Sequence, residues 1–252
     1  MSFFCLFSFV NLVLSAHLGV SFEEKSSIES SFIIDNRVEK KFDFYGEARQ
    51  DEFIYKTFFF KKEEPGIFVD VGSHNGVTHS NSFFFEKELG WNGICIEPNP
   101  FLFKELQATR KCKCINVACS NSKGMRNFIF HPCSFVSGLS EFLTSEHKLG
   151  FGTEEAIKTG AAKEVLVYCE VLNDIFDQNE LTEIDFLSID TEGADLAILM
   201  SIDFEKFNIK VIAVEGIPEM FLDFMLSKGY VSFGRIGNDA IFYKKGSIFS
   251  EE

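Results

Sequence analysis

GIFVDVGSHNG, residues 66–76, is followed by GICIEP, residues 93–98, and these two stretches decide how the chain folds. Each contains a short apolar run of the kind that forms a buried strand. The first run leads through a glycine-rich turn into a helical stretch, and the second ends on Glu97. Glycines let a ligand approach the backbone, and an acid at a strand end can bind the hydroxyls of a ribose. The pattern therefore predicts a sheet edge that holds a nucleoside-like cofactor.

The rest of the chain repeats this alternation of strands and helices. Further strands are predicted over residues 113–119, 126–130, 165–171, 184–189, 210–214, 230–233 and 240–243. Helices are predicted over residues 46–60, 78–89, 101–109, 172–176 and 194–200, and between Pro218 and Gly229. Such alternation predicts an α/β fold with a mostly parallel sheet and helices on both faces. The last two strands predict a hairpin that adds one antiparallel strand.

The sequence divides into three parts. Residues 1–20 are apolar and uncharged, and we interpret them as a signal peptide or membrane anchor, although the basic start typical of a signal is missing. The alternative is a helix that packs on the domain. Residues 21–44 are polar and predict a linker or arm, and residues 45–246 predict the folded domain. This organisation favours the secretory pathway or membrane association through the N-terminus over the cytoplasm.

The overall composition limits the functional classes. The chain has 252 residues and a net charge of −14, and no run of basic residues is longer than two. A nucleic-acid partner is therefore disfavoured, because such proteins usually carry a basic patch. The seven cysteines include no C-x-x-C pair, so no zinc site is predicted. Small buried hydrophobic side chains are the favoured interpretation of the cysteines, and disulfides are the alternative.

Acids end four of the predicted strands, namely Asp70, Glu97, Asp190 and Glu215. The carboxyl ends of parallel strands meet at one edge of an open sheet, where ligands bind. Each acid alone could cap a helix, but four at one edge favour a site. The turn Gly72–Gly76 then suits the carboxylate of S-adenosylmethionine, while Asp70 organises the turn and Glu97 binds the ribose hydroxyls. NAD is the disfavoured alternative, because the turn lacks the G-x-G-x-x-G pattern.

Several segments, in order along the chain, resemble the FkbM-type methyltransferases. They are Gln50-Asp51, VDVGSHNG (69–76), SNS (80–82), GWNGICIEPNP (90–100), NVACS (116–120), SGL (137–139) and IDFLSIDTEG (184–193). The resemblance covers about residues 45–245 and implies a class I, Rossmann-like, S-adenosylmethionine-dependent fold with a seven-stranded sheet. The predicted cofactor-binding residues are Gln50, Asp70, Gly72, Ser73, His74, Gly76, Asn81, Glu97, Pro98, Ala118 and Asp190. Two positions depart from the family pattern: His74 replaces an Asn or small residue, and Ser188 replaces a common Lys.

Asp190 and Glu192 are the predicted catalytic residues. Asp190 is the first candidate for the base that activates a hydroxyl acceptor, and Glu192 is the second. Glu192 could instead be an acid of the next helix's first turn, and the two carboxylates could hold Mg²⁺. The predicted function is S-adenosylmethionine-dependent O-methylation of a sugar, a glycan or another small hydroxylated acceptor. The alternatives are a membrane-tethered, non-catalytic interaction protein with the same fold and an NAD-dependent enzyme.

Overall fold

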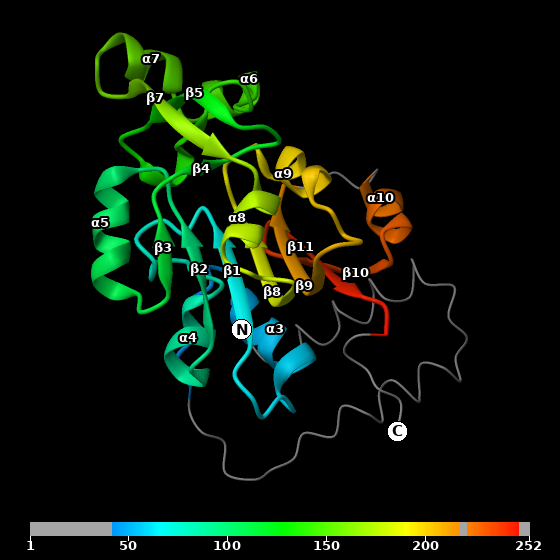
Figure 1. Ribbon diagram of the computed structural model, residues 1–252. Coiled ribbons are helices and arrows are strands. Elements are labelled where there is room, and N and C mark those ends of the chain that lie inside the picture. The colour runs from blue at the N-terminus through cyan, green and yellow to red at the C-terminus, as the bar shows by residue number, and fades with distance from the viewer. Residues whose placement is uncertain (1–41, 217–220, 247–252) are drawn as a thin grey trace, which may run out of the picture. The chain divides into compact units, whose positions relative to one another are not determined.

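Figure 1 shows the computed structural model of the chain, which describes residues 42–216 and 221–246. The elements described below all belong to one compact unit, Asp43–Glu252, so it is the second unit whose architecture is described. The apolar segment 1–20 and most of the predicted linker lie outside the described residues. No helix among the described residues is long and apolar enough to cross a membrane.

A seven-stranded sheet forms the centre of the second unit. Its strands are β1 (Ile67–Val71), β2 (Asn92–Ile96), β3 (Lys113–Ile115), β8 (Glu183–Ile189), β9 (Asn208–Glu215), β10 (Tyr230–Ile236) and β11 (Asp239–Lys244). They lie in the order β10-β11-β9-β8-β1-β2-β3. The neighbours from β9 to β3 pair in parallel, whereas β11 is antiparallel to both β9 and β10. The predicted α/β fold with a large, mostly parallel sheet is confirmed.

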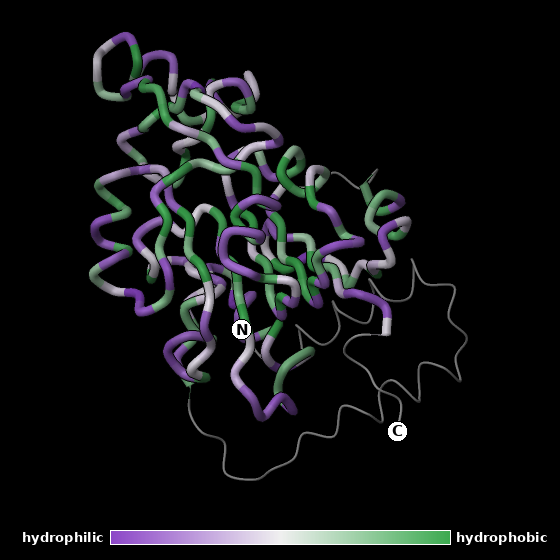
Figure 2. Tube along the Cα trace, in the orientation of Figure 1, coloured by the Kyte–Doolittle hydropathy of each residue, from purple (hydrophilic) through white to green (hydrophobic). Residues whose placement is uncertain are grey.

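The central strands are buried on both faces. In β1 every residue from Phe68 to Val71 is buried, and in β8 every residue from Ile184 to Ile189 is buried. Mostly apolar strands of this kind are typical of parallel sheets that are covered on both sides. The hydrophobic colouring in Figure 2 accordingly follows the strands at the centre of the unit. The polar residues at the ends of these strands therefore emerge together at one edge of the sheet.

Helices connect the strands of the large sheet. They are α3 (Gln50–Ile54) with a π-helical continuation (Tyr55–Phe59), α4 (Phe83–Leu89), α5 (Pro100–Thr109), α8 (Leu172–Gln178), α9 (Asp195–Ser201) and α10 (Leu222–Ser227). Pro100 occupies the first turn of α5, and Oδ1 of Asn99 accepts a hydrogen bond from the N–H of Phe101. Both features are typical of a helix start. Helix α4 ends at Gly90, whose φ of 67° is left-handed, as the sequence predicts.

A second sheet of four strands is absent from the sequence prediction. Its order is β4 (Ala118–Cys119), β7 (Lys163–Glu170), β5 (Gly124–Phe130) and β6 (Gly138–Leu139). The predicted single strand 113–119 is wrong, because β3 and β4 belong to different sheets. Asn116 separates them: its Nδ2 donates hydrogen bonds to the carbonyls of Glu97 (2.7 Å) and Pro98 (3.1 Å). These bonds hold Asn116 at the end of β2, where the chain leaves the large sheet and enters the second one.

The second sheet covers the carboxyl ends of the large sheet. Helices α6 (Ser145–Gly150) and α7 (Thr153–Lys158) lie between β6 and β7 in the chain. In Figure 1 these elements lie at the top of the view, beyond the ends of β1 and β2. Residues of β4 and β5 line the same cleft as the ends of β1, β2 and β8. The cleft therefore lies between the two sheets, at the edge where the sequence predicts the site.

Candidate active site

Most of the predicted site residues line one cleft. Those that do are Asp70, Gly72, Ser73, His74, Asn81, Glu97, Pro98, Ala118, Asp190 and Glu192. Gln50 and Gly76 are not among its lining residues. Gln50 instead accepts a hydrogen bond from the N–H of Ala48, and the carbonyl of Gly76 accepts one from Arg110. These two residues support the elements that carry the site and do not face the cleft.

The turn after β1 passes very close to the end of β8. Gly72 has a φ of 88°, and a Cβ at this position would lie 1.7 Å from the carbonyl oxygen of Asp190. The N–H groups of Gly72 and Ser73 both donate to the carbonyl of Ile96, at 2.9 and 3.0 Å. Only glycine fits this approach without displacing the backbone. The turn is thereby locked between β8 and β2.

The predicted helix 78–89 begins later than the sequence indicates. Helix α4 starts at Phe83, and its N-cap residue Ser82 makes no side-chain cap hydrogen bond. Oγ of Ser80 accepts the N–H groups of Ser82 (3.3 Å) and Phe83 (3.1 Å), which holds the residues before the helix in a turn. Oδ1 of Asn75 accepts the N–H groups of Val77 and Thr78 and forms a separate turn. The glycine turn therefore leads into a loop and not directly into a helix.

Glu97 joins the turn to the end of β2. Its Oε2 accepts the N–H of His74 at 2.9 Å, and its Oε1 accepts the N–H of Asn99 at 2.7 Å. Burial raises the pKa of Glu97 to about 7, although the two backbone hydrogen bonds act in the opposite direction. A carboxylate oxygen has two lone-pair directions, so each oxygen can accept one further hydrogen bond.

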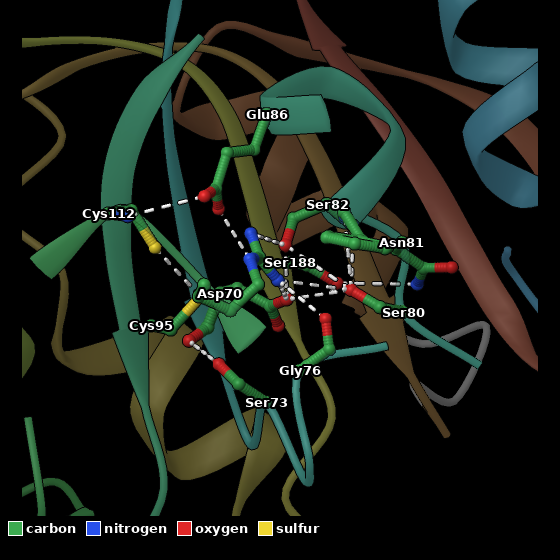
Figure 3. A network of polar contacts seen from close by, with 12 residues as sticks. Asp70, Ser73, Gly76, Ser80, Asn81, Ser82, Glu86, Cys95, Cys112 and Ser188 are labelled. Atoms are coloured by element: carbon green, nitrogen blue, oxygen red, sulfur yellow. Dashed lines mark hydrogen bonds and ion pairs between the residues drawn. The ribbon is translucent and has the colours of Figure 1, made fainter. Parts of the chain in front are cut away.

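A buried ion network lies behind the turn (Figure 3). The side chain of Arg110 is fully buried, and it lies 3.9 Å from Asp70 and bonds to Glu86. Asp70 also accepts the hydroxyl of Ser82, and Arg110 donates to the carbonyl of Gly76 at 3.1 Å. Burial raises the pKa of Asp70, and the charge of Arg110 opposes that rise. The network fixes both ends of the segment between the turn and α4.

Asn81 links this loop to two other strands. Its Nδ2 donates to Asp239 in β11 at 2.9 Å and to Ser188 in β8 at 3.3 Å. Ser188, at the family's lysine position, is therefore an acceptor that holds the loop. Oδ1 of Asn81 and Nδ1 of His74 are buried atoms that have no hydrogen-bond partner within the described residues. Both belong to side chains that line the cleft, so each could form a hydrogen bond with a bound ligand.

Carboxylates gather on the other side of the cleft. Oxygens of Asp190, Glu192 and Glu215 lie within 4.8 Å of one another, and among the described residues they are the only such group of three acids, histidines or cysteines. Glu215 thus supplies a third oxygen donor to the two that the sequence predicts. The group has the hard oxygen ligands that Mg²⁺ or Ca²⁺ prefers, and it could equally hold a cationic ligand.

The same carboxylates hold their protons unusually strongly. Asp190 opens to the cleft but is enclosed by protein on its other sides, and this burial, together with the charges of Glu215, Asp195 and Glu192, raises its pKa well above the usual range. Burial and the charges of Glu215 and Asp195 raise the pKa of Glu192 to about 8. At neutral pH the group is therefore poised to exchange protons.

Asp195 shapes the loop that carries the two predicted catalytic acids. Its Oδ1 accepts the N–H and the hydroxyl of Thr191, at 2.7 and 2.9 Å, and its Oδ2 accepts the N–H of Gly193 at 2.8 Å. Glu192 between them has a left-handed φ of 56°. Asp195 is buried, and that burial raises its pKa to about 6. The alternative view of Glu192 as an acid in the first turn of α9 is wrong, because α9 begins at Asp195.

Three contributors to the site escape prediction from the sequence. Phe135 stacks on His74, with ring centroids 4.3 Å apart, and on His79 at 5.1 Å, and it thereby covers one side of the cleft. It comes from the loop before β6, which no motif ties to the glycine turn. Arg110 has no signal beyond its place after a predicted helix. Asp195 does have a sequence signal, because it is an acid four residues beyond Thr191, at the start of a mostly apolar helix.

Comparisons with known proteins identify the family of the chain. Residues 70–232 match the sequence profile of the methyltransferase FkbM domain. Among solved structures, the chain is similar to a methyltransferase FkbM from Methylobacillus flagellatus KT, with 14% identity and a TM-score of 0.42. That match covers 75% of this chain and 47% of the other, so the chain spans about half the length of that protein. No curated protein matches. The matched domain takes in the glycine turn, Glu97 and Asp190, and on this evidence the chain belongs to the FkbM methyltransferase family.

Proposed function

We propose that this protein is an S-adenosylmethionine-dependent methyltransferase with a class I fold that methylates an oxygen of a sugar or another small hydroxylated acceptor. The observation that carries the proposal is that the glycine turn, Glu97 and Asp190 line a single cleft. The acceptor class is supported by the family and by the chain's net charge of −14, which disfavours nucleic acid.

The residues present fit the cofactor. The N–H groups of Gly72, Ser73 and Gly76 bond to backbone carbonyls and that of His74 bonds to Glu97, so the shape of the turn beside the cleft is set before a ligand binds. Glu97 keeps one acceptor direction on each oxygen for the two ribose hydroxyls. The unpartnered Nδ1 of His74 is a further polar group beside the turn. When bound, the cofactor supplies a methyl group on a sulfonium, which is an excellent leaving group.

The carboxylates beside β8 supply the remaining chemistry. A hydroxyl acceptor is a better nucleophile when a base removes its proton, and such a base works best when its pKa is close to the working pH. Glu192, with a pKa of about 8, meets that condition, and Asp190 lies beside it at the end of β8. The carboxylates of Asp190, Glu192 and Glu215, when ionised, also attract a positive charge into the cleft. Asp190 and Glu192 are therefore assigned to acceptor activation and Glu97 to cofactor binding.

Calorimetric titration with S-adenosylmethionine tests the proposal. Saturable binding is expected for the wild type, with affinity rising from pH 6 to pH 8 as Glu97 ionises around its pKa of about 7. Replacing Glu97 by Gln is expected to weaken binding by about tenfold to a hundredfold, since two charge-assisted hydrogen bonds are lost. The exposed Glu63→Gln variant is the control and keeps wild-type affinity. Tighter binding of NAD than of S-adenosylmethionine would instead support the NAD-dependent alternative.

Turnover needs a separate measurement. Incubation of the protein with methyl-labelled S-adenosylmethionine and fractionated glycan and small-molecule pools is expected to give a labelled acceptor. Asp190→Asn and Glu192→Gln are expected to abolish or slow the labelling while cofactor binding persists. Cofactor binding without transfer to any pool would favour the membrane-tethered, non-catalytic alternative.

A further inference from the structure

We propose that Cys95 and Cys112 form a dithiol site that peroxide converts to a disulfide, and that the Arg110 network transmits this change to the glycine turn. The first part stands independently of the proposed function. The second part rests on it, because its consequence is a change in cofactor affinity.

The two sulfurs are already in contact (Figure 3). Sγ of Cys112 donates to Sγ of Cys95 at 3.5 Å. A disulfide bond is about 2.05 Å long, so the sulfurs have to approach by roughly 1.5 Å. Cys112 immediately precedes β3, in the connection from α5, where the backbone is not held in a strand ladder. Cys114 is the register partner of Cys95, but its Sγ contacts the carbonyl of Cys112 at 3.6 Å.

The surroundings of the pair differ from those of an inert buried cysteine. Cys95 is fully buried, whereas Cys112 is partly exposed. Although burial lowers the pKa of Arg110, the neighbouring Cys95, Asp70, Cys112 and Glu86 raise it, which places its positive charge beside both sulfurs. A nearby cation stabilises a thiolate and partial exposure admits an oxidant, and both favour reaction, whereas the hydrogen bond to Cys95 and the burial that raise the pKa of Cys112 oppose it.

The neighbouring thiol of Cys95 and two charged groups, Glu86 and Arg110, set the pH dependence of the oxidation. The hydrogen bond to Cys95, burial and the charge of Glu86 raise the pKa of Cys112, while Arg110 opposes the rise. The thiolate is the reactive form, so oxidation is expected to accelerate as the pH increases above neutral.

The reaction is balanced with hydrogen peroxide as the oxidant. The thiolate of Cys112 attacks one peroxide oxygen, the O–O bond breaks, and a sulfenic acid and water result. Sγ of Cys95 then attacks the sulfenic sulfur, the S–O bond breaks, and a second water leaves as the S–S bond forms. The two thiols together lose two electrons and two protons to one peroxide.

The Glu86 carboxylate connects this pair to the turn. Its Oε1 accepts the N–H groups of Lys111 (2.5 Å) and Cys112 (3.3 Å), and its Oε2 binds Nε of Arg110. Arg110 in turn holds the carbonyl of Gly76. Movement of Cys112 toward Cys95 therefore pulls on the group that positions Arg110, and through it on the turn that the cofactor needs.

Peptide mapping of the full chain tests the dithiol. The protein is treated with hydrogen peroxide at pH 8, alkylated without reductant and digested. The expected product links the peptides of Cys95 and Cys112, with a mass lower by two hydrogens, and it disappears in Cys112→Ser. The matched control Cys133→Ser removes an exposed cysteine elsewhere and keeps the link. Absence of this link, or linkage of Cys114 in its place, would overturn the inference.

Calorimetry with S-adenosylmethionine then tests the coupling. Affinity is expected to fall by about tenfold on oxidation of the wild type and to recover with dithiothreitol, since contacts along such a network modulate coupling by amounts of this order. In Cys112→Ser the affinity is expected to be insensitive to peroxide. Equal affinity of the linked and reduced proteins would overturn the coupling. If the reduced protein binds no S-adenosylmethionine, the proposed function fails, while the peptide map still decides the dithiol.

Discussion

The acids on the two sides of the cleft have opposite electrostatic surroundings. On the β1 side, Asp70 is buried but lies beside the fully buried guanidinium of Arg110. On the β8 side, Asp190 opens to the cleft, and the charges that shift its pKa belong to Glu215, Asp195 and Glu192. An acid that is neutralised internally stabilises the scaffold, whereas an acid surrounded by other acids retains capacity for a cation or a proton. The β1 side therefore builds the site, and the β8 side carries the acids to which we assign acceptor activation.

Removing the cation of the β1 side is expected to have the largest effect. Arg110→Met leaves Asp70 and Glu86 buried without their partner and should lower the free energy of unfolding by about 3–5 kcal/mol. Asp190→Asn removes one of several mutually repelling charges and should leave stability unchanged or raise it. Urea denaturation of both variants measures the difference. Equal losses in the two would erase the distinction between the sides.

The contact between the two sides can be broken at Gly72. Gly72→Ala places a Cβ against the Asp190 carbonyl and imposes a left-handed φ on a residue with a side chain, so a loss of about 2–4 kcal/mol is expected. Gly90→Ala is the matched control: its φ is also left-handed, but no atom lies within 4 Å of the added Cβ. It should cost only about 1 kcal/mol. Similar losses in thermal denaturation would mean that the close approach is unimportant.

The influence of Asp195 on the β8 side can be measured separately. Its charge contributes to the raised pKa of Glu192, so Asp195→Asn should lower the titration midpoint of Glu192 by roughly one pH unit. Carboxyl-labelled NMR of Glu192 follows this midpoint. A purely structural role for Asp195 would disorder the loop without this directed shift, and a midpoint that stays at about 8 would contradict the electrostatic role.

The pH dependence of stability gives a further comparison. Glu97 and Glu192 have pKa values of about 7 and about 8, above their ordinary value of 4.5, so the native state binds more protons than the unfolded state between these limits. The free energy of unfolding should therefore fall as the pH rises from about 5 to about 8. Glu192→Gln should flatten the upper part of this fall, whereas Glu63→Gln should not. Urea denaturation across the range gives the comparison.

The sequence predicts the β1 side of the cleft far better than the residues that cover the cleft from the second sheet. Apolar runs and glycines are local signals, so β1, the turn and Glu97 are placed correctly from residues 66–98 alone. The break at Asn116 depends on the carbonyls of Glu97 and Pro98, and the position of Phe135 depends on the second sheet. Such contacts join residues distant in the chain and leave no periodic pattern. The neutralisation of Asp70 by Arg110 is hidden for the same reason.

A crystal structure with S-adenosylhomocysteine tests the central claim most directly. The account predicts that both ribose hydroxyls bond to the carboxylate of Glu97, with the amino-acid end over the turn Gly72–Gly76 and the sulfur facing Asp190. A product molecule bound elsewhere, or a cleft that stays closed by Phe135 at saturating ligand, would contradict it.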